Sequence, residues 1–467
     1  MAAQARVAGL LERTFGLGER GTDIRTEVIA GITTFMTMAY ILFVNPAVLS
    51  AVPGGLPNGA VLTVTALVAG AMTIAMGLAA NYPFAIASGL GLNAVVTFQL
   101  VAGQGLSFPE AMGVVVSEGV LITVLVLTGF REAVLDAIPV ELKKAIGAGI
   151  GLFIAVIGFA NSGVIVAGPE GGPLLTRGPL GTGRIVVFIV GLLLTMLLVT
   201  QRVKGGLLIS IVSTTVLAIA VNHVSGGDLW SSVGPDTARL PSRIVAAPDF
   251  SLLGAFSFGF LAKLGALSAA LAVFTLMLAD FFDTMGTAIA LGHEGGFLDE
   301  QGHLPRMSRV LLIDSIAAAV GGAASASSAT TYIESASGIS SGARTGLASV
   351  VTGALFFAAL FLSPLAGVIP PEATAPTLIL VGFFMMSVIR DLPWDDYTIA
   401  IPAFLTMIVM PFTYSITDGI GWGFVSYTVI KAGTGRFREV HWLMAASSAL
   451  FIIYFAAEEI RRLISAG

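Results

Sequence analysis

The chain has 467 residues, of which 56% are hydrophobic and only 11% charged, and its formal net charge is −5. A soluble domain carries about 25% charged residues, so this chain cannot cover a water-exposed surface and we expect a lipid bilayer to surround it. The small net charge gives no indication of a nucleic-acid partner, and the absence of cysteine excludes disulfides and cysteine-based metal sites.

Residues 1–27 precede the first long apolar run. They carry Arg6, Arg13, Arg20 and Arg25 and contain no short apolar core that ends in a cleavage site, so they do not resemble a cleavable signal. Arginine-rich segments stay on the cytoplasmic side of a membrane under the positive-inside rule. We therefore predict a multi-pass protein of the plasma (inner) membrane with a cytoplasmic N-terminal segment over 1–27.

A membrane-spanning helix needs about 20 predominantly apolar residues. Segments of suitable composition cover 28–49, 60–80, 110–129, 142–161, 183–200, 205–222, 266–291, 309–324, 343–363, 374–389, 398–413 and 416–432. Two further segments, 83–103 and 325–342, lie at membrane depth by position and bring the expected total to fourteen. The connections that this topology places in the cytoplasm carry basic residues, namely Arg131, Lys143, Lys144, Arg202, Lys204, Arg306, Arg309, Arg344, Arg390, Lys431, Arg436 and Arg438.

A fifteenth apolar segment covers 440–458 and ends in Glu458, Glu459, Arg461 and Arg462. Its composition allows it either to span the membrane or to lie in the interface. Because fourteen spans are complete without it, we favour an extra peripheral helix.

The two unusual segments, 83–103 and 325–342, are too rich in Gly, Ser and Thr for helices that face lipid. Irregular backbone at membrane depth occurs only where it is buried in protein or lines a cavity. Both segments contain Ala-Ser-Gly, at 87–89 and 336–338, and each is the third span of a seven-span half. Since seven is odd, the second half begins on the opposite side of the membrane, which indicates two inverted repeats.

A polar stripe crosses one apolar helix. Asp280, Asp283, Thr284 and Thr287 follow the spacing i, i+3, i+4, i+7 within 266–291 and therefore share one helix face. An ionised carboxylate near the bilayer centre costs about 2.5–3.5 kcal/mol on insertion scales, so such acids need a reason to be there. The stripe either binds a substrate or a proton, or it satisfies neighbouring broken backbone.

Other polar residues lie within or beside the unusual segments. Glu334 follows the β-prone Thr-Thr-Tyr-Ile run of 330–333, at a position that suits either ligand binding or capping of a half-helix. Asn93 occupies the matching place in the first half, where an asparagine either binds a ligand or bonds across helices.

Three more acids stand alone in their segments. Glu118 and Asp314 are expected to pair with backbone groups or hydroxyls inside the bundle. Asp418 follows Ser415 and Thr417 at a helix start, which favours a capping role for it.

No basic residue lies securely at the centre of any candidate span. The expected site offers carboxylates, an amide, hydroxyls and backbone groups, which suits a neutral, planar, N–H-rich molecule or a cation better than an anion. A carboxylate can accept two parallel N–H bonds from one edge of such a ligand. A buried carboxylate also provides a way to couple transport to protons.

Several motifs resemble a known family. Thr-Thr-Tyr-Ile-Glu-Ser-Ala-Ser-Gly (330–338), Asp-Phe-Phe-Asp-Thr-Met-Gly-Thr (280–287), Gly-Leu-Asn (91–93) and Ile-Thr-Thr-Phe-Met-Thr-Met-Ala-Tyr-Ile (32–41) look like the nucleobase–cation symporter-2 superfamily. The adenine/guanine/hypoxanthine permease branch is the most similar, over about residues 14 to 440. The resemblance implies an all-α protein with fourteen spans in two inverted seven-span repeats, in which spans 3 and 10 are discontinuous and contain short β-strands.

The same resemblance implies a core domain and a gate domain that usually forms a homodimer. Applied to this chain, it gives core residues 28–129 and 251–365, gate residues 130–250 and 366–434, a cytoplasmic segment over 1–27 and an extra helix over 435–467. It further implies a secondary active transporter, not an enzyme, that imports purine nucleobases by an elevator-like or rocking movement. No cofactor or metal is implied, and the coupling ion is expected to be a proton.

Site residues follow from the motif positions. The resemblance implies that Asp280 and Glu334 bind the purine and converge in one pocket. Further substrate contacts are expected from Asn93, Tyr332, Ile333, Thr331 and Ser88. Asp283, with Thr284 and Thr287 beside it, resembles a coupling or conformational residue.

Three other functions were weighed. An anion exchanger of the same fold would need a positive charge at the site, which Asp280 and Glu334 argue against. An intramembrane Mg²⁺-dependent prenyltransferase could use Asp280-Phe-Phe-Asp283, but a second Asp-rich motif and basic residues for the diphosphate are missing. A cation channel would also be lined by acids, but it would show no saturable, gradient-dependent cargo.

Overall fold

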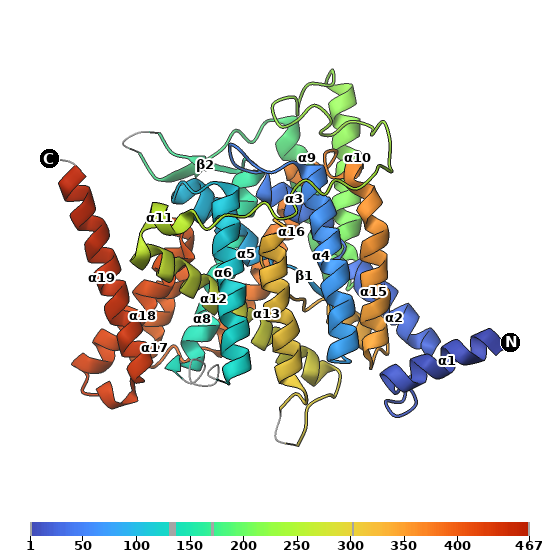
Figure 1. Ribbon diagram of the computed structural model, residues 1–467. Coiled ribbons are helices and arrows are strands. Elements are labelled where there is room, and N and C mark those ends of the chain that lie inside the picture. Colours follow the sequence, from blue (N-terminus) through green and yellow to red (C-terminus); the bar gives the residue numbers. More distant parts are fainter. Residues whose placement is uncertain (1, 130–136, 170–171, 301–302, 466–467) are drawn as a thin grey trace.

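The computed structural model describes residues 2–129, 137–169, 172–300 and 303–465, and this part of the chain is predominantly helical (Figure 1). The helices of the first half are α1 (Ala2–Phe15), α2 (Ile24–Met38), α3 (Ile41–Leu49), α4 (Asn58–Ala79), α5 (Leu90–Ala94), which continues into the wider turns of η1 (Val95–Gly103), α6 (Phe108–Thr128), α8 (Val140–Asn161), α9 (Gly183–Thr200) and α10 (Gly206–Val224). Those of the second half are α11 (Phe260–Leu264), α12 (Ala266–Glu294), α13 (Met307–Ala323), α14 (Ser335–Ser340), α15 (Gly346–Ala359), α16 (Pro371–Met386), α17 (Tyr397–Thr413), α18 (Ile416–Gly433) and α19 (Trp442–Ser465). Short 3-10 turns, η2 (Leu360–Leu365), η3 (Ser387–Asp391) and η4 (Phe437–Glu439), extend or link them.

Four short strands form two separate pairs. Strand β1 (Ile86–Ser88) pairs antiparallel with β4 (Ala329–Thr331), and β2 (Ile165–Ala167) pairs antiparallel with β3 (Leu175–Arg177). The first pair is buried inside the helical bundle, whereas β2 and β3 lie in a largely exposed connection.

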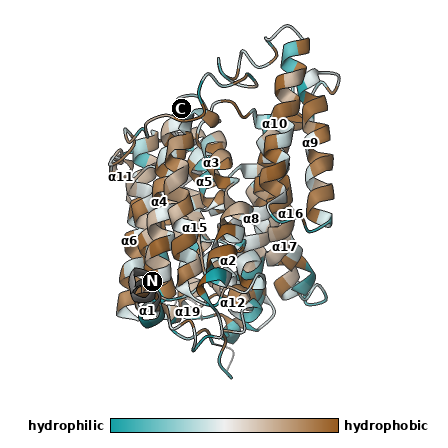
Figure 2. Ribbon diagram, turned by 90° about the vertical axis from the view of Figure 1, so that its right-hand side faces the viewer, coloured by the Kyte–Doolittle hydropathy of each residue, from teal (hydrophilic) through white to brown (hydrophobic). Residues whose placement is uncertain are grey.

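The helices have the length and composition of membrane spans. Within the described residues, nine helical stretches are long and apolar enough to cross a membrane, namely Ile24–Leu49, Asn58–Ala79, Phe108–Thr128, Val140–Asn161, Gly183–Thr200, Gly206–Val224, Ala266–Glu294, Gly346–Leu365 and Pro371–Asp391. Shorter apolar helices cover Leu90–Gly103, Tyr397–Thr413 and Trp442–Ala456. Hydrophobic residues dominate the helices and hydrophilic residues gather at their two ends (Figure 2). The protein is therefore a multi-span membrane protein.

The first span is broken in its middle. The stretch Ile24–Leu49 covers the single span predicted over 28–49, and within it α2 ends at Met38 and α3 begins at Ile41. The helix also starts earlier than predicted, because Asp23 accepts a 2.9 Å hydrogen bond from the backbone N–H of Thr26 and caps it. The break places Tyr40 at the junction, fully buried in the bundle.

The helices fall into two groups that lie side by side (Figure 2). In one group α4 packs along α15 and α6 packs along α13, while in the other α16 packs along α8 and α17 packs along α18. The β1–β4 pair belongs to the first group, where it contacts α4, α12 and α13. We call the interface between the two groups the seam.

Two helix ends refine the sequence predictions. Ser415, not Asp418, caps α18, because its hydroxyl accepts the backbone N–H of Asp418 at 3.1 Å. Asp418 therefore lies in the first turn of the helix, three residues after the N-cap residue. From Trp442 onwards the segment 440–458 belongs to α19, which runs lengthwise beside α18 at the edge of the bundle (Figure 1) and bonds to it through Ser448 and Thr428 at 2.7 Å.

Candidate functional site

Two broken segments meet at the centre of the first helix group. Strand β1 pairs with β4 in the register Ile86 to Thr331, Ala87 to Thr330 and Ser88 to Ala329. The ladder continues beyond the strands, since Tyr332 N–H donates to Ala85 O at 2.9 Å and Gly89 N–H donates to Ser328 O at 2.8 Å. The free edge of β1 is satisfied by the Thr73 hydroxyl, which bonds both Ile86 N–H and Ile86 O. Backbone polar groups that lipid could not satisfy are thereby paired inside the protein.

A cavity lies where the strand pair faces the seam. It encloses about 570 Å³, including the space at its open mouth, which is within the range of small-molecule sites. From the first helix group it is lined by Tyr40, Gly89, Leu90, Gly91, Leu92, Ala279, Asp283, Thr287, Thr330, Thr331, Tyr332, Ile333 and Glu334. From the second group it is lined by Ile150 of α8 and by Val381 and Met385 of α16.

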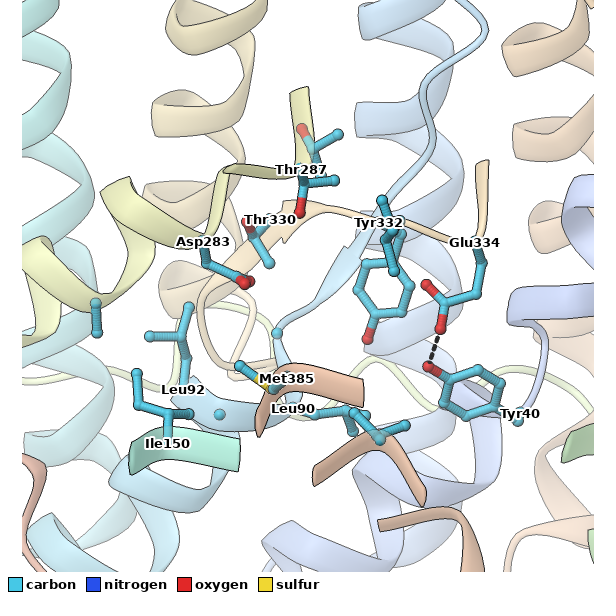
Figure 3. A pocket seen from close by; sticks show the side chains of 16 residues that line it. Tyr40, Leu90, Leu92, Ile150, Asp283, Thr287, Thr330, Tyr332, Glu334 and Met385 are labelled. Carbon is cyan, nitrogen blue, oxygen red and sulfur yellow. Dashed lines mark hydrogen bonds between the residues drawn. The ribbon is translucent and has the colours of Figure 1, made fainter. Parts of the chain in front are cut away.

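Two acids from distant parts of the chain face this cavity. Asp283 projects into it from α12, and Glu334 and Tyr332 project from the segment between β4 and α14 (Figure 3). The hydroxyl of Tyr40 donates a hydrogen bond to Glu334 Oε1, and the hydroxyl of Tyr332 donates to the carbonyl oxygen of Ser88. Tyr40 therefore orients the Glu334 carboxylate, and aromatic and aliphatic side chains line the cavity around both acids.

Not every residue predicted to bind substrate lies at the cavity. Thr331, Tyr332, Ile333 and Glu334 line it, as do Asp283 and Thr287 from the expected coupling group. Three other predicted residues, Asp280, Asn93 and Ser88, are not among its lining residues, and neither is Thr284. The Ser88 hydroxyl instead donates to Ala326 O at 2.7 Å, and both polar atoms of the fully buried Asn93 lack a partner among the described residues.

The expectation that Asp280 and Glu334 converge in one pocket is not met, because Asp283 takes that place. Positions three apart on a helix differ by about 60° around its axis. This difference is enough to direct Asp283 into the cavity while Asp280 faces α6, where its carboxyl lies at hydrogen-bond distance from that of Glu118.

Asp314 of α13 ties the strand pair to α12. Its Oδ1 accepts hydrogen bonds from the backbone N–H and the hydroxyl of Thr331 at 2.8 and 2.7 Å. Its Oδ2 accepts the hydroxyl of Thr284 at 2.6 Å, and this hydroxyl also contacts the Thr330 hydroxyl at 2.6 Å. The predicted pairing of Asp314 with backbone and hydroxyl groups is present, and it fixes the wall of the cavity beside Asp283.

Some lining residues were missed by the sequence analysis. Tyr40 lies within the 32–41 motif, but its position at a helix break could not be read from an uninterrupted apolar run. Ile150, Val381 and Met385 are ordinary apolar residues of apolar helices and carry no sequence signal. Gly91 shows how closely the groups approach, since a Cβ there would lie 2.5 Å from Ile150 Cγ2.

One end of the seam is closed by a buried polar contact. Gln99 of η1 donates from Nε2 to the Thr417 hydroxyl at 2.7 Å and accepts the backbone N–H of Ile416 at 2.8 Å. Thr275 of α12 also contacts the Thr417 hydroxyl at 2.8 Å. Beside them the ring of Tyr414 packs edge-on against Phe98 and Phe153. These contacts join the two helix groups on the side of the cavity nearer the start of α12.

The chemistry of the cavity is acidic and apolar. None of its lining residues in the described part of the chain is Arg, Lys or His. Two carboxylates, two phenols, threonine hydroxyls and the backbone at the start of α5 can accept or donate hydrogen bonds, while the aliphatic side chains provide flat apolar walls. Such a site can hold a planar molecule that donates hydrogen bonds, and it offers no counter-charge to an anion.

Comparison with known proteins places the chain in a family. A family model for xanthine/uracil permeases, described as a permease family, matches residues 25–421. The guanine/hypoxanthine permease PbuG of Bacillus subtilis is 42% identical over 448 residues, which cover 94% of this chain and 98% of that protein. The adenine permease AdeP of Escherichia coli is 41% identical over 445 residues, which cover 95% of this chain and 96% of that protein.

A solved structure shares the fold. The transmembrane domain of the cyanobacterial bicarbonate transporter BicA superposes with a TM-score of 0.62 at 16% identity and covers 83% of this chain and 96% of that chain. This similarity concerns the fold alone. The match over most of the chain shows that the protein belongs to the xanthine/uracil (nucleobase–cation symporter-2) family of membrane permeases, which are transporters and not enzymes.

Proposed function

We propose that this protein imports purine nucleobases, namely adenine, guanine or hypoxanthine, into the cell. The observation that carries the proposal is the cavity at the strand pair. Asp283 and Glu334 both line this cavity, together with aromatic and aliphatic side chains. A purine is planar and carries N–H groups at its edges, which the two carboxylates can accept. The names of the relatives from Bacillus subtilis and Escherichia coli support the same substrate class.

The proposed substrate contacts are Asp283, Glu334, Tyr332, Thr331 and Ile333. Asp283 replaces Asp280 in this set because it lines the cavity and Asp280 does not. The hydrogen bond from Tyr40 orients Glu334 for the ligand.

The proposed mechanism is an elevator-like or rocking movement in which the first helix group carries the purine past the second. Two observations support this movement. Residues of both helix groups line the cavity, and the contact between Gln99 and Thr417 closes one end of the seam. In this proposal the protein has fourteen spans in two inverted repeats, a cytoplasmic N-terminus, a proton as the coupling ion and a homodimeric assembly through the second group.

Anion exchange is the alternative that the shared fold suggests, and the acidic lining argues against it. Uptake of radiolabelled adenine or hypoxanthine into proteoliposomes, with and without an imposed pH gradient, tests the proposal. Adenine, guanine, hypoxanthine, xanthine and uracil are added in turn as unlabelled competitors. Saturable uptake that purines inhibit and an inward proton gradient drives is the expected result, and uptake of bicarbonate or sulfate without purine uptake would overturn it.

A further inference from the structure

A second acidic site lies beside the cavity, on the face of α12 that is turned about 60° from Asp283. Glu118 is in the middle of α6 and Asp280 is in the middle of α12, and neither side chain is exposed (0% each). Their carboxyl groups lie within hydrogen-bond distance of each other. Helices α6, α12 and α13 pack together here (Figure 1), so no solvent reaches the pair.

The pair lacks the donors that buried carboxylates require. Within the described ranges, no N–H or hydroxyl group donates a hydrogen bond to either carboxyl oxygen of Asp280 or to Oε1 of Glu118. The Ser328 hydroxyl lies 3.5 Å from Glu118 Oε2, at the far limit of a hydrogen bond. No Lys, Arg or His of the described residues forms an ion pair with either acid.

Other fully buried acids in this protein are treated differently. Glu27 accepts three backbone N–H groups at the start of α15, at 2.7, 3.1 and 3.2 Å. Glu372 bonds the Arg184 guanidinium and the Trp230 indole N–H. Glu27 and Glu372 thus receive several hydrogen bonds from donors of the protein, whereas Glu118 Oε1 and both oxygens of Asp280 receive none from the described residues.

Neighbouring charges increase this contrast. Asp314 of α13 lies near the pair and accepts hydrogen bonds from Thr284 and Thr331, while Asp283 lies on the next turn of α12. Ionisation of both of two adjacent buried carboxyl groups is disfavoured, because desolvation and mutual repulsion act together. A proton held between the two acids would supply the hydrogen-bond donor that the pair lacks.

We propose that Glu118 and Asp280 share one proton, carried as a carboxyl O–H donating to the partner's carboxylate, and that this is the proton transported with the substrate. The proposal rests on the function proposed above. The proton binds from water on the outer side and leaves to water in the cytoplasm. Its release leaves two adjacent carboxylates, a state that requires water to reach α6 and α12, so release depends on a rearrangement of the helices.

A short connection links this site to the cavity. Asp280 lies one turn from Thr284, whose hydroxyl contacts both Asp314 and Thr330, and Thr330 lines the cavity. Ser328, beside Glu118, precedes β4 and accepts the Gly89 N–H through its carbonyl oxygen. A change of charge at Glu118 and Asp280 therefore acts on the β1–β4 strand pair, which forms a wall of the proposed purine site.

Transport measurements on Glu118→Gln test the proposal. Glutamine keeps the shape of the side chain and can donate an N–H to Asp280, so it replaces the shared proton permanently. We expect Glu118→Gln to exchange labelled for unlabelled purine across proteoliposomes, whereas its proton-driven accumulation falls to the level seen without a gradient. The matched control is Glu110→Gln, at the partly exposed end of the same helix, which should accumulate purine like the wild type.

The outcomes separate the two proposals. If the wild type neither exchanges nor accumulates purine, the proposed function is wrong. If the wild type accumulates purine and Glu118→Gln does so equally in response to the gradient, the shared-proton site is wrong.

Infrared spectroscopy of the purified full-length protein provides a test that needs no transport. We expect the wild type at neutral pH to show absorption of a protonated carboxyl group that is lost in Glu118→Gln and in Asp280→Asn but kept in Glu110→Gln. Identical carboxyl absorption in all four proteins would overturn the proposal even if the variants were inactive.

Discussion

Tyr40 and Glu334 join two helix breaks that lie almost 300 positions apart in the sequence. The phenol stands between α2 and α3, the carboxylate stands between β4 and α14, and the hydroxyl of Tyr40 donates to Glu334 Oε1 (Figure 3). A second contact of 2.6 Å, between the hydroxyls of Thr37 and Ser337, lies one turn away. Glu334, an acid that lines the cavity, is therefore held by Tyr40 at the interruption of the first span.

Replacement of Tyr40 by Phe should weaken purine binding without unfolding the protein, because only the hydroxyl is removed. Hydrogen bonds to charged groups contribute about 1.5–3 kcal/mol, so KM for purine uptake should rise by about tenfold or more. Uptake kinetics in proteoliposomes measure this effect. Tyr397→Phe, at an exposed position (74%), is the matched control and should keep the wild-type KM. An unchanged KM in Tyr40→Phe would show that Glu334 needs no such orientation.

Asp283 and Asp280 should behave differently when converted to Asn. Asp283→Asn removes a carboxylate that lines the cavity, and the loss of charged hydrogen bonds to the purine should raise KM by about 10–150-fold. Asp280→Asn should mainly reduce accumulation driven by protons, since Asp280 faces Glu118. Purine binding measured by isothermal titration at constant pH separates the two. Weaker binding in Asp280→Asn than in Asp283→Asn would restore Asp280 to the substrate site.

The sequence predicted the broken segments because composition and position both marked them. Thr330 and Thr331 favour an extended backbone, and strand β4 covers both of them. Glu334 was placed beside a ligand by the same reasoning, and it lines the cavity. Local chemistry is visible in a sequence wherever a residue type contradicts its lipid surroundings.

The sequence could not predict the direction in which each acidic side chain points. Helix α12 is buried on two sides, so a polar stripe does not reveal whether Asp280 or Asp283 turns towards the cavity. Glu118 appeared isolated because its partner lies on a helix distant in sequence. Likewise, the apolar residues Ile150 and Met385 complete the cavity only through the packing of the second helix group.

In the proposed topology Gln99 should control access from the outer side, because its amide joins the two helix groups at the closed end of the seam. Gln99→Ala removes two hydrogen bonds of about 1 kcal/mol each, which should shift the equilibrium towards outward opening by about 30-fold. Since the chain has no cysteine, Thr287→Cys introduces a single thiol in the cavity. A membrane-impermeant thiol reagent added outside should label it faster in the Gln99→Ala background. Equal labelling rates would show that the contact does not restrain opening.

Close packing of α4 on α15 should make Gly346 intolerant of any side chain. A Cβ at Gly346 would lie 1.9 Å from the carbonyl oxygen of Gly77, so the two helices would have to separate. Small residues allow such close approach of helices in membranes, and overpacking costs about 1–3 kcal/mol. We expect Gly346→Ala to lower the Tm of the detergent-solubilised protein by several degrees.

Gly147→Ala in α8 is the control for this effect, because a Cβ there meets nothing within 4 Å. Alanine is the better helix former, so this substitution should leave the Tm unchanged or raise it slightly. Addition of a purine should raise the Tm of both variants, since a ligand that binds only the folded state stabilises it. The strand pair contacts α4. A wild-type Tm in Gly346→Ala would therefore mean that α4 and α15 can separate without disturbing the wall of the cavity.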